Sequence, residues 1–206
     1  MHEVSLGGVL VDYLSGEARE RTTYEDLRQA LLAWVVEQKG FPKSWLAAHV
    51  PVAYNTDMPQ ESPESSLHER KGAGVRTADL TIVKPGAAVV GSSSQNGNTN
   101  LLLLLFCPGQ VYTYQREAQA MARLAGFPLV AVTDTRDLVL FAAATGQETG
   151  KGPGDFPGPE ALLSLASAHP LPVLAPLERT MESRILHAYT GLQKTCCTEN
   201  CVFQGQ

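Results

Sequence analysis

The sequence has no excess of basic residues. Its 206 residues include 16 Lys and Arg against 21 Asp and Glu, which gives a formal net charge of −5. Proteins that coat nucleic acid neutralise phosphates with many cations, so this balance argues against binding to bulk nucleic acid. One local basic cluster is a candidate for phosphate contacts: Arg70, Lys71 and Arg76, with His68 beside them. A charged loop without a ligand is the alternative interpretation of this cluster.

Long apolar segments are also missing. The longest run, residues 101–107 (LLLLLFC), is far shorter than the roughly 20 residues that a helix needs to cross a bilayer. The first ten residues hold no basic run followed by a long apolar segment, so no secretory signal is indicated. We therefore expect a cytoplasmic protein without a membrane partner.

Cysteine is scarce. Of the four cysteines, Cys196, Cys197 and Cys201 stand close together near the C-terminus, and Cys107 ends the apolar run. In a reducing cytosol they are expected as thiols or metal ligands rather than as disulfides. A [4Fe–4S] cluster generally needs four thiolates, and a zinc site would need His187 beside the three C-terminal cysteines. Free thiols in a disordered tail are the simpler expectation.

The rest of the sequence predicts a succession of helices and strands. A first helix begins at Thr22 or Thr23, whose hydroxyl can cap it, and ends before Gly40 and Pro42. The residues expected to form its core-facing stripe recur at helical spacing: Leu27, Ala30, Leu31, Trp34 and Val35. Strands are predicted at 46–54, 75–83, 101–107, 129–132 and 138–142, with a helix at 111–124 before the last two.

Three hairpin-connected strands followed by a crossover helix predict a mixed sheet with helices on its faces. The fold class is therefore α/β (α+β), with an αβββαβ core. We expect this domain over residues 1–146, a Gly/Pro-rich linker at 147–159, a C-terminal helical extension at 160–195 and a cysteine-containing tail at 196–206.

This order of elements is the one shared by the PD-(D/E)xK nucleases, the restriction-endonuclease-like superfamily. Over residues 12–146 the chain resembles in particular the N-terminal domain of type I restriction enzyme R subunits. The motifs that carry the resemblance are DYLSG at 12–16, TYEDLRQ at 23–29, KGFPK at 39–43, RTADL at 76–80, REAQ at 116–119 and VTD at 132–134.

The resemblance implies Mg²⁺-dependent cleavage of DNA. In such enzymes a strand Asp and an acid on the next strand hold the cation, and a lysine two residues later positions the attacking water. Asp79 matches the first of these positions and lies in an otherwise apolar strand. Phe106 and Pro108 stand at the second acid and lysine positions, and neither residue can coordinate Mg²⁺ or orient water. The catalytic set is therefore expected to be incomplete.

Other side chains are candidates to complete the site. Glu25 on the first helix is the candidate for an outer metal ligand. Some nucleases of this fold carry the lysine on the neighbouring helix, where Arg116 and Glu117 stand here; a solvated helix face is the alternative interpretation of this pair. His49 stands where relatives often have an acid, although a half-buried histidine is its simpler interpretation. Lys84 lies just past the strand that holds the aspartate.

We expect a stand-alone nuclease-fold protein linked to DNA cleavage or binding, in which catalysis is lost or weakened and Mg²⁺ is needed only if the protein is active. A Gly-rich Lys-Ser/Thr phosphate loop is absent from the sequence, so an ATP-driven motor is not expected. One alternative is an active Mg²⁺-dependent DNA nuclease with a relocated catalytic lysine or arginine. Another is a protein-binding module, or an unrelated α/β domain, without a nucleic-acid role.

Overall fold

The structure is a computed structural model, and it describes residues 4–55, 73–86, 99–107, 110–134 and 136–196. In the described residues the strands are β1 (Ser5–Val11), β2 (Ala18–Thr22), β3 (Leu46–Asn55), β4 (Ala73–Lys84), β5 (Thr99–Phe106), β6 (Leu129–Thr133), β7 (Leu138–Ala142) and β8 (Glu148–Lys151). The α-helices are α1 (Thr23–Glu37), α2 (Gln115–Ala125), α3 (Pro159–Ala168) and α4 (Pro176–Cys196). The 3-10 helices are η1 (Lys43–Trp45), η2 (Val111–Tyr114) and η3 (Pro153–Asp155).

Six strands form one mixed sheet in the order β3-β4-β5-β6-β7-β8. Neighbouring strands are antiparallel except β5 and β6, which are parallel because α2 carries the chain from one end of the sheet back to the other. The predicted fold class, a mixed sheet flanked by helices, is confirmed. The predicted order of helix, three strands, helix and strand is also present, as α1, β3, β4, β5, α2 and β6.

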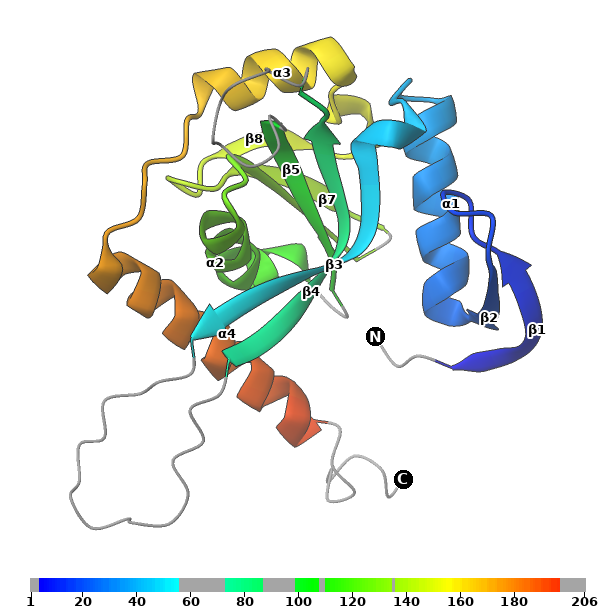
Figure 1. Cartoon of the computed structure of the whole chain (residues 1–206), viewed down its shortest axis with the longest axis horizontal. Helices are drawn as coiled ribbons and strands as arrows, with labels where there is room; N and C mark the ends of the chain where they lie inside the picture. Colours follow the sequence, from blue (N-terminus) through cyan, green and yellow to red (C-terminus); the bar gives the residue numbers. More distant parts are fainter. Residues whose placement is uncertain (1–3, 56–72, 87–98, 108–109, 135, 197–206) are drawn as a thin grey trace.

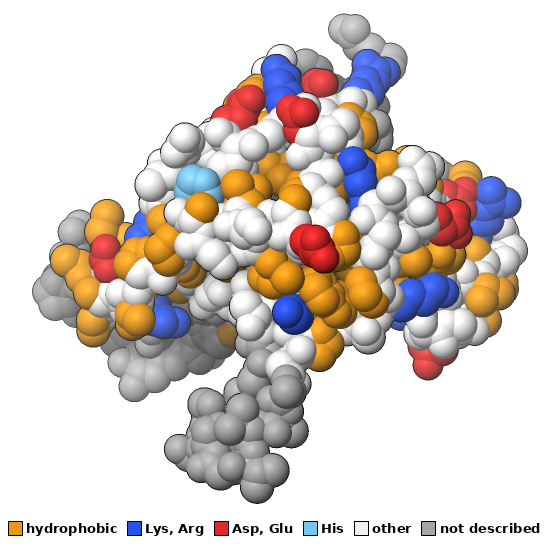
Figure 2. Space-filling view, turned by 90° about the horizontal axis from the view of Figure 1, so that it is seen from above, with side chains coloured by type: hydrophobic (Ala, Val, Ile, Leu, Met, Phe, Trp, Pro, Cys, Tyr) orange, Lys and Arg blue, Asp and Glu red, His pale blue; other side chains and the backbone are white. Residues whose placement is uncertain are grey.

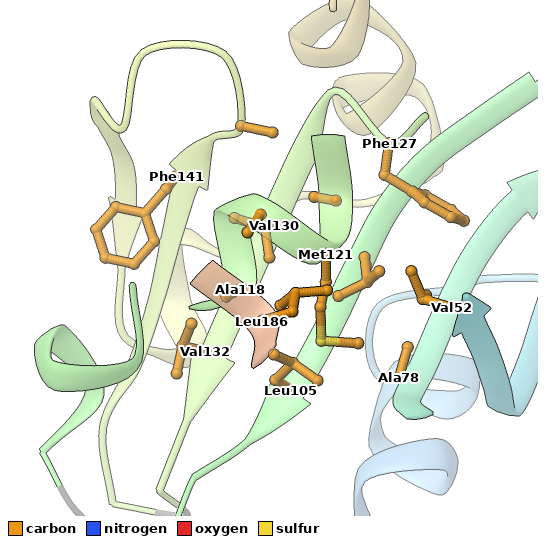
Figure 3. Packing of buried hydrophobic residues seen from close by; sticks show 14 of the residues in the cluster. Val52, Ala78, Leu105, Ala118, Met121, Phe127, Val130, Val132, Phe141 and Leu186 are labelled. Carbon is orange, nitrogen blue, oxygen red and sulfur yellow. The ribbon is translucent and has the colours of Figure 1, made fainter. Parts of the chain in front are cut away.

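Helices cover both faces of this sheet. The side chains of β5 alternate, so that Leu102 and Leu104 face the core cluster under α1 and α3, while Leu103 and Leu105 face the cluster under α2 and α4. Figure 3 shows the second cluster, in which Met121 of α2 lies among side chains of the sheet. The run at 101–105 is almost completely buried, as predicted for a central strand covered on both faces.

The C-terminal helices belong to the same body as the sheet. Leu162 of α3 and Leu186 of α4 are fully buried, one in each core cluster. The stretch expected as a linker, 147–159, instead contributes β8, which pairs with β7 at the edge of the sheet. Gly and Pro in that stretch form the turns around a short strand rather than a spacer between two units.

A separate two-stranded sheet precedes α1. β1 and β2 pair antiparallel, and the turn between them uses Gly16 at φ +74°, a left-handed conformation that glycine adopts without strain. The hairpin lies beside α1 at one side of the molecule (Figure 1). Val9 and Val11 of β1 are each 68% exposed, so this strand presents apolar side chains to solvent.

The first helix begins where the sequence predicts, but it turns a different face toward the core. Thr22 caps it by accepting a hydrogen bond from the N–H of Glu25 at 3.1 Å. The face turned to the protein interior carries Arg28, Leu32 and Val35. Three members of the predicted stripe contact the core: Val35 is buried, and Leu31 and Trp34 are half-buried and pack against the cluster under α1 and α3. Leu27 is half-buried, and Ala30 is exposed. Burial of Arg28 explains the difference, because hydrophobic periodicity assigns a charged residue to the outside.

Among the described residues, none of the helices is long and apolar enough to span a membrane.

Candidate functional site

A buried charge network holds the N-terminal end of α1. The side chain of Arg28 is completely buried and lies between two carboxylates, with its Nη2 2.6 Å from Asp12 and its Nε 3.0 Å from Glu25. Arg19 adds a third cation contact, 3.0 Å from Asp12. Although burial alone would raise the pKa of Asp12, the hydrogen bonds from Arg28 and from neighbouring N–H groups hold this pKa far below its ordinary value.

The same network fixes Glu25, which the sequence suggested as an outer metal ligand. One carboxylate oxygen of Glu25 accepts from Arg28, and the other lies 3.1 Å from Nε2 of His49 on β3. Burial raises the pKa of Glu25, but the charge and hydrogen bond of Arg28 outweigh it and leave this pKa below its ordinary value. Both oxygens of Glu25 are thus engaged by protein cations and donors.

Asp79 lies on β4, beside the carboxyl end of β5 and the first turn of α1. One of its oxygens accepts a hydrogen bond from the hydroxyl of Tyr24, and the other accepts from the backbone N–H of Phe106 at 2.6 Å. The phenyl ring of Phe106 packs edge-on against the ring of Tyr24, with centroids 6.0 Å apart. The aromatic residue at the expected acid position therefore lies at the site, and its backbone rather than its side chain contacts Asp79.

Burial dominates the electrostatics of this carboxylate. It raises the pKa of Asp79 above its ordinary value, and the hydrogen bonds from Tyr24 and Phe106, with the charges of His49 and Arg76, only partly oppose the rise. Burial next to this charge also raises the pKa of Tyr24 well above its ordinary value, so the hydroxyl remains a donor. The Asp79 carboxyl group therefore serves as the acceptor in both of these hydrogen bonds.

Glu117 on α2 is also part of this region. It is only 1% exposed and forms an ion pair with Arg76, the residue three positions before Asp79 on β4. Burial raises the pKa of Glu117, the charge of Arg76 lowers it, and the charge of Asp79 raises it further. A solvated helix face is therefore the wrong interpretation for Glu117, which points into the protein toward β4.

Arg116, its neighbour, points elsewhere. Adjacent helical residues differ by about 100° in direction, and Arg116 extends to α4, where it pairs with the buried Glu182 at 3.3 Å. Arg123 binds the same carboxylate. Lys84 is exposed at the far end of β4, five residues or roughly 16 Å from Asp79 at the usual strand rise. Neither Arg116 nor Lys84 therefore lies where it could serve as the lysine that the resemblance implies.

His49 has an unusual backbone for a strand residue. Its φ of +54° is left-handed. Among the described residues, His49 is the only non-glycine residue with a positive φ. The side chain is half-buried, as predicted, and its ring lies 6.0 Å from that of Tyr24 while contacting Glu25. Strained residues of this kind cluster at functional sites, so the strain at His49 favours a functional role for this end of the sheet.

Other predicted site residues lie outside the described part of the structure. They are His68, Arg70, Lys71, Pro108, Cys197 and Cys201, and the side chain of Cys196. Cys107 is buried in the core cluster under α2, and His187 is exposed on α4. The predicted basic cluster thus has one described member, Arg76, which is paired with Glu117.

The side chains at this site do not fit a magnesium ion. Mg²⁺ requires carboxylate oxygens with lone pairs directed at it in octahedral geometry. Both oxygens of Asp79 accept hydrogen bonds from the protein, Glu117 is paired with Arg76, and a phenyl ring stands at the second acid position. Within the described residues, groups of three or more His, Cys, Asp or Glu arranged to hold a metal are absent.

Comparisons with protein-family models, curated proteins and solved structures found no match to this chain. The similarity to type I R subunits therefore rests on the motifs and on the order of the elements, and it remains a prediction.

Two residues of the site were missed from the sequence, Tyr24 and Arg28. Both stand inside the TYEDLRQ motif at 23–29, which was used only as a mark of resemblance. Arg28 follows Glu25 by three residues, a spacing that lets oppositely charged side chains pair on a helix. Pairing with Asp12 depends on the turn before β2 and has no local signal.

Proposed function

We propose that the protein is a catalytically degenerate member of the restriction-endonuclease-like superfamily, which binds nucleic acid without cleaving it. The observation that carries the proposal is the closed environment of Asp79, whose two oxygens are taken by Tyr24 and by the N–H of Phe106. A carboxylate held in this way has its lone pairs directed at protein donors. Nucleic acid is chosen as the ligand because the resembling family acts on DNA.

The proposed contacts with phosphate are few. Figure 2 shows a face on which acidic, basic and hydrophobic side chains are interspersed, so the described part of this face offers no continuous basic surface. The net charge of −5 also argues for few contacts with phosphate. Affinity should therefore depend on contacts to bases or on a few local cations, because counterion release from many phosphates does not contribute.

The test measures binding and cleavage separately. The full chain is titrated at low salt without metal into fluorescent single-stranded and duplex DNA, and the same substrates are then incubated with Mg²⁺ or Mn²⁺. We expect binding of at least one substrate and no cleavage of either. Metal-dependent cleavage that is abolished in both Asp79→Asn and Asp79→Ala, but not in the exposed control Asp155→Asn, would contradict the proposal.

An active nuclease with a relocated acid is the second candidate, and the burial of Glu117 next to Asp79 favours it. In that case Glu117 would replace the acid missing from β5, and the Arg76–Glu117 and Tyr24–Asp79 contacts would have to open when substrate binds. Cleavage lost in Glu117→Gln as well as in Asp79→Asn supports this candidate. Cleavage retained in Glu117→Gln rules it out.

A protein-binding module without a nucleic-acid role is favoured by the exposed apolar residues of β1 and by Val4, which precedes it. Val4, Leu6, Val9 and Val11 are between 49% and 68% exposed. Proteins often use such surfaces for partners. The same titration distinguishes this candidate from the nucleic-acid-binding protein. Failure to bind any single-stranded or duplex nucleic acid at low salt would favour the protein-binding module.

A further inference from the structure

A surface pocket of about 250 Å³ lies beside the candidate site, between α1 and the carboxyl ends of β5 and β6. Leu27, Leu31 and Trp34 line one wall, so the half-buried apolar side of α1, which also packs on the core through Leu31 and Trp34, faces this pocket. Phe106 contributes a second aromatic surface from the end of β5. The residue whose N–H holds Asp79 therefore also forms a wall of the pocket.

The remaining lining is mixed: Ala30, Leu138 and Pro153 add apolar surface, and three polar residues lie together at the end of β6. Thr133 ends β6, and Arg136 and Asp137 follow it in an exposed turn; all three line the pocket. The hydroxyl of Thr133 donates to the backbone oxygen of Asp137 at 2.7 Å, which fixes the turn against the end of the strand. A second cation is near, since the Nζ of Lys39 lies 5.2 Å from the centroid of the Trp34 ring.

The size and lining of the pocket restrict what can fill it. Pockets for drug-sized ligands usually measure about 300–1,000 Å³, so this one suits a single ring system better than a large cofactor. A nucleobase has two flat π faces and a hydrogen-bonding edge, which match aromatic walls combined with Thr133, Arg136 and Asp137. An aliphatic side chain of a protein partner would use only the walls and would leave the polar lining without a role.

We propose that this pocket holds one unpaired nucleobase of a single strand, stacked against Phe106 and Trp34, with Arg136 placed for the adjoining phosphate. The inference rests on the proposed function and deepens it by naming single-stranded nucleic acid as the ligand. It also assigns a role to Phe106, which stands at the expected position of the second acid. The phenyl ring would provide a surface on which a base stacks, where the resemblance implies a metal ligand.

A single-stranded oligonucleotide that contains 2-aminopurine tests the pocket, because the fluorescence of this base is quenched when it stacks on an aromatic ring. With the full chain at low salt and without metal, we expect quenching on binding. Phe106→Leu keeps the backbone N–H that Asp79 needs and should weaken binding roughly five- to hundredfold. Tyr112→Leu, which removes another exposed aromatic ring outside the pocket, is the matched control and should bind as the wild type does.

A second variant guards against a folding defect in the first. Ala30→Glu puts a negative charge on an exposed helix position that lines the pocket, and it should repel the strand. Ala161→Glu, at an exposed position of α3 outside the pocket, is its control. We expect weaker binding in Ala30→Glu only.

The outcomes separate this inference from the proposed function. Strand binding without quenching, or with equal affinity in the wild type, Phe106→Leu and Ala30→Glu, would overturn the pocket and leave nucleic-acid binding intact. It would also leave the pocket as a place for a protein side chain. Failure of the wild type to bind any strand or duplex would overturn both. Quenching lost in Phe106→Leu and retained in Tyr112→Leu supports both.

Discussion

The buried Asp12 and the half-buried Asp79 have pKa values that shift in opposite directions. Asp12 contacts Arg28 and Arg19 directly and accepts further hydrogen bonds from backbone N–H groups, so its charged form is favoured. Asp79 accepts from one neutral hydroxyl and one N–H, and its nearest cations act only at a distance, so its pKa lies above the ordinary value. Direct contact with a cation, more than depth of burial, decides which way the pKa moves.

The raised pKa of Asp79 predicts a specific pH dependence. Because the folded state binds this proton more tightly than the unfolded chain does, protonation of Asp79 adds stability as the pH falls from above its folded pKa toward the ordinary value of 3.8. Asp79→Asn keeps the shape of the side chain and cannot titrate. Urea unfolding at several pH values should show the wild type gaining free energy of unfolding relative to Asp79→Asn as the pH falls from 7. A constant difference, or a loss, would contradict the assignment.

The buried guanidinium of Arg28 predicts a large loss of stability when it is removed. Arg28→Met leaves Asp12 and Glu25 as buried charges without their main partner, which should lower the free energy of unfolding by about 3–5 kcal/mol. Arg21 forms an ion pair of similar geometry with Asp26, but its side chain is 52% exposed. The control Arg21→Met should therefore cost at most about 1 kcal/mol. Equal losses, measured by urea unfolding, would refute a structural role for the network.

Among the secondary-structure elements, those with strong local signals were predicted well. The run at 101–107 reads as a buried strand because every residue is apolar, and Thr22 identifies the start of α1 because its hydroxyl can accept a backbone N–H. β8 was missed because Gly and Pro around it suggest a linker, and its pairing with β7 is tertiary. The orientation of α1 was missed for a similar reason, since burial of Arg28 depends on Asp12, which lies 16 residues away in the sequence, as well as on its neighbour Glu25.

The C-terminal helix α4 should be required for the stability of the whole sheet. Leu186 is fully buried in the core cluster under α2 (Figure 3), so Leu186→Ala should lower the free energy of unfolding by about 2–5 kcal/mol. Leu177 lies on the same helix and is 72% exposed, and Leu177→Ala should change stability by no more than about 0.5 kcal/mol. Similar effects of the two substitutions would mean that α4 is an appendage.

The candidate site was predictable only in part. Asp79 and Phe106 were located from the motif order, and the structure brings them together at the end of β5. The partner of Glu117, the hydroxyl of Tyr24 and the contact of His49 with Glu25 required the tertiary structure, because these side chains come from α1, α2, β3 and β4. Single-sequence patterns specify which face of an element is apolar, but they do not specify which polar residues of different elements meet.

For the molecule as a whole, the net charge of −5 predicts a weak dependence of binding on salt. If Arg136 and Lys39 supply the phosphate contacts, the logarithm of the single-strand association constant should fall with the logarithm of salt concentration with a slope of about −1.4. Titrations between low and moderate salt measure this slope. A slope steeper than about −4 would show that many more cations contact phosphates, and would contradict binding mainly through a base in the pocket.

The backbone kink at His49 has a consequence at the outer edge of the sheet. β3 is an edge strand, and besides the kink it contains Pro51, which has no N–H to offer another chain. The opposite edge is β8, a strand of four residues that runs directly into η3. Within the described strands, each edge of the six-stranded sheet is thus too short or too irregular to template a foreign strand. Concentrated solutions of the folded protein should therefore resist growth into fibrils through edge-to-edge pairing of this sheet.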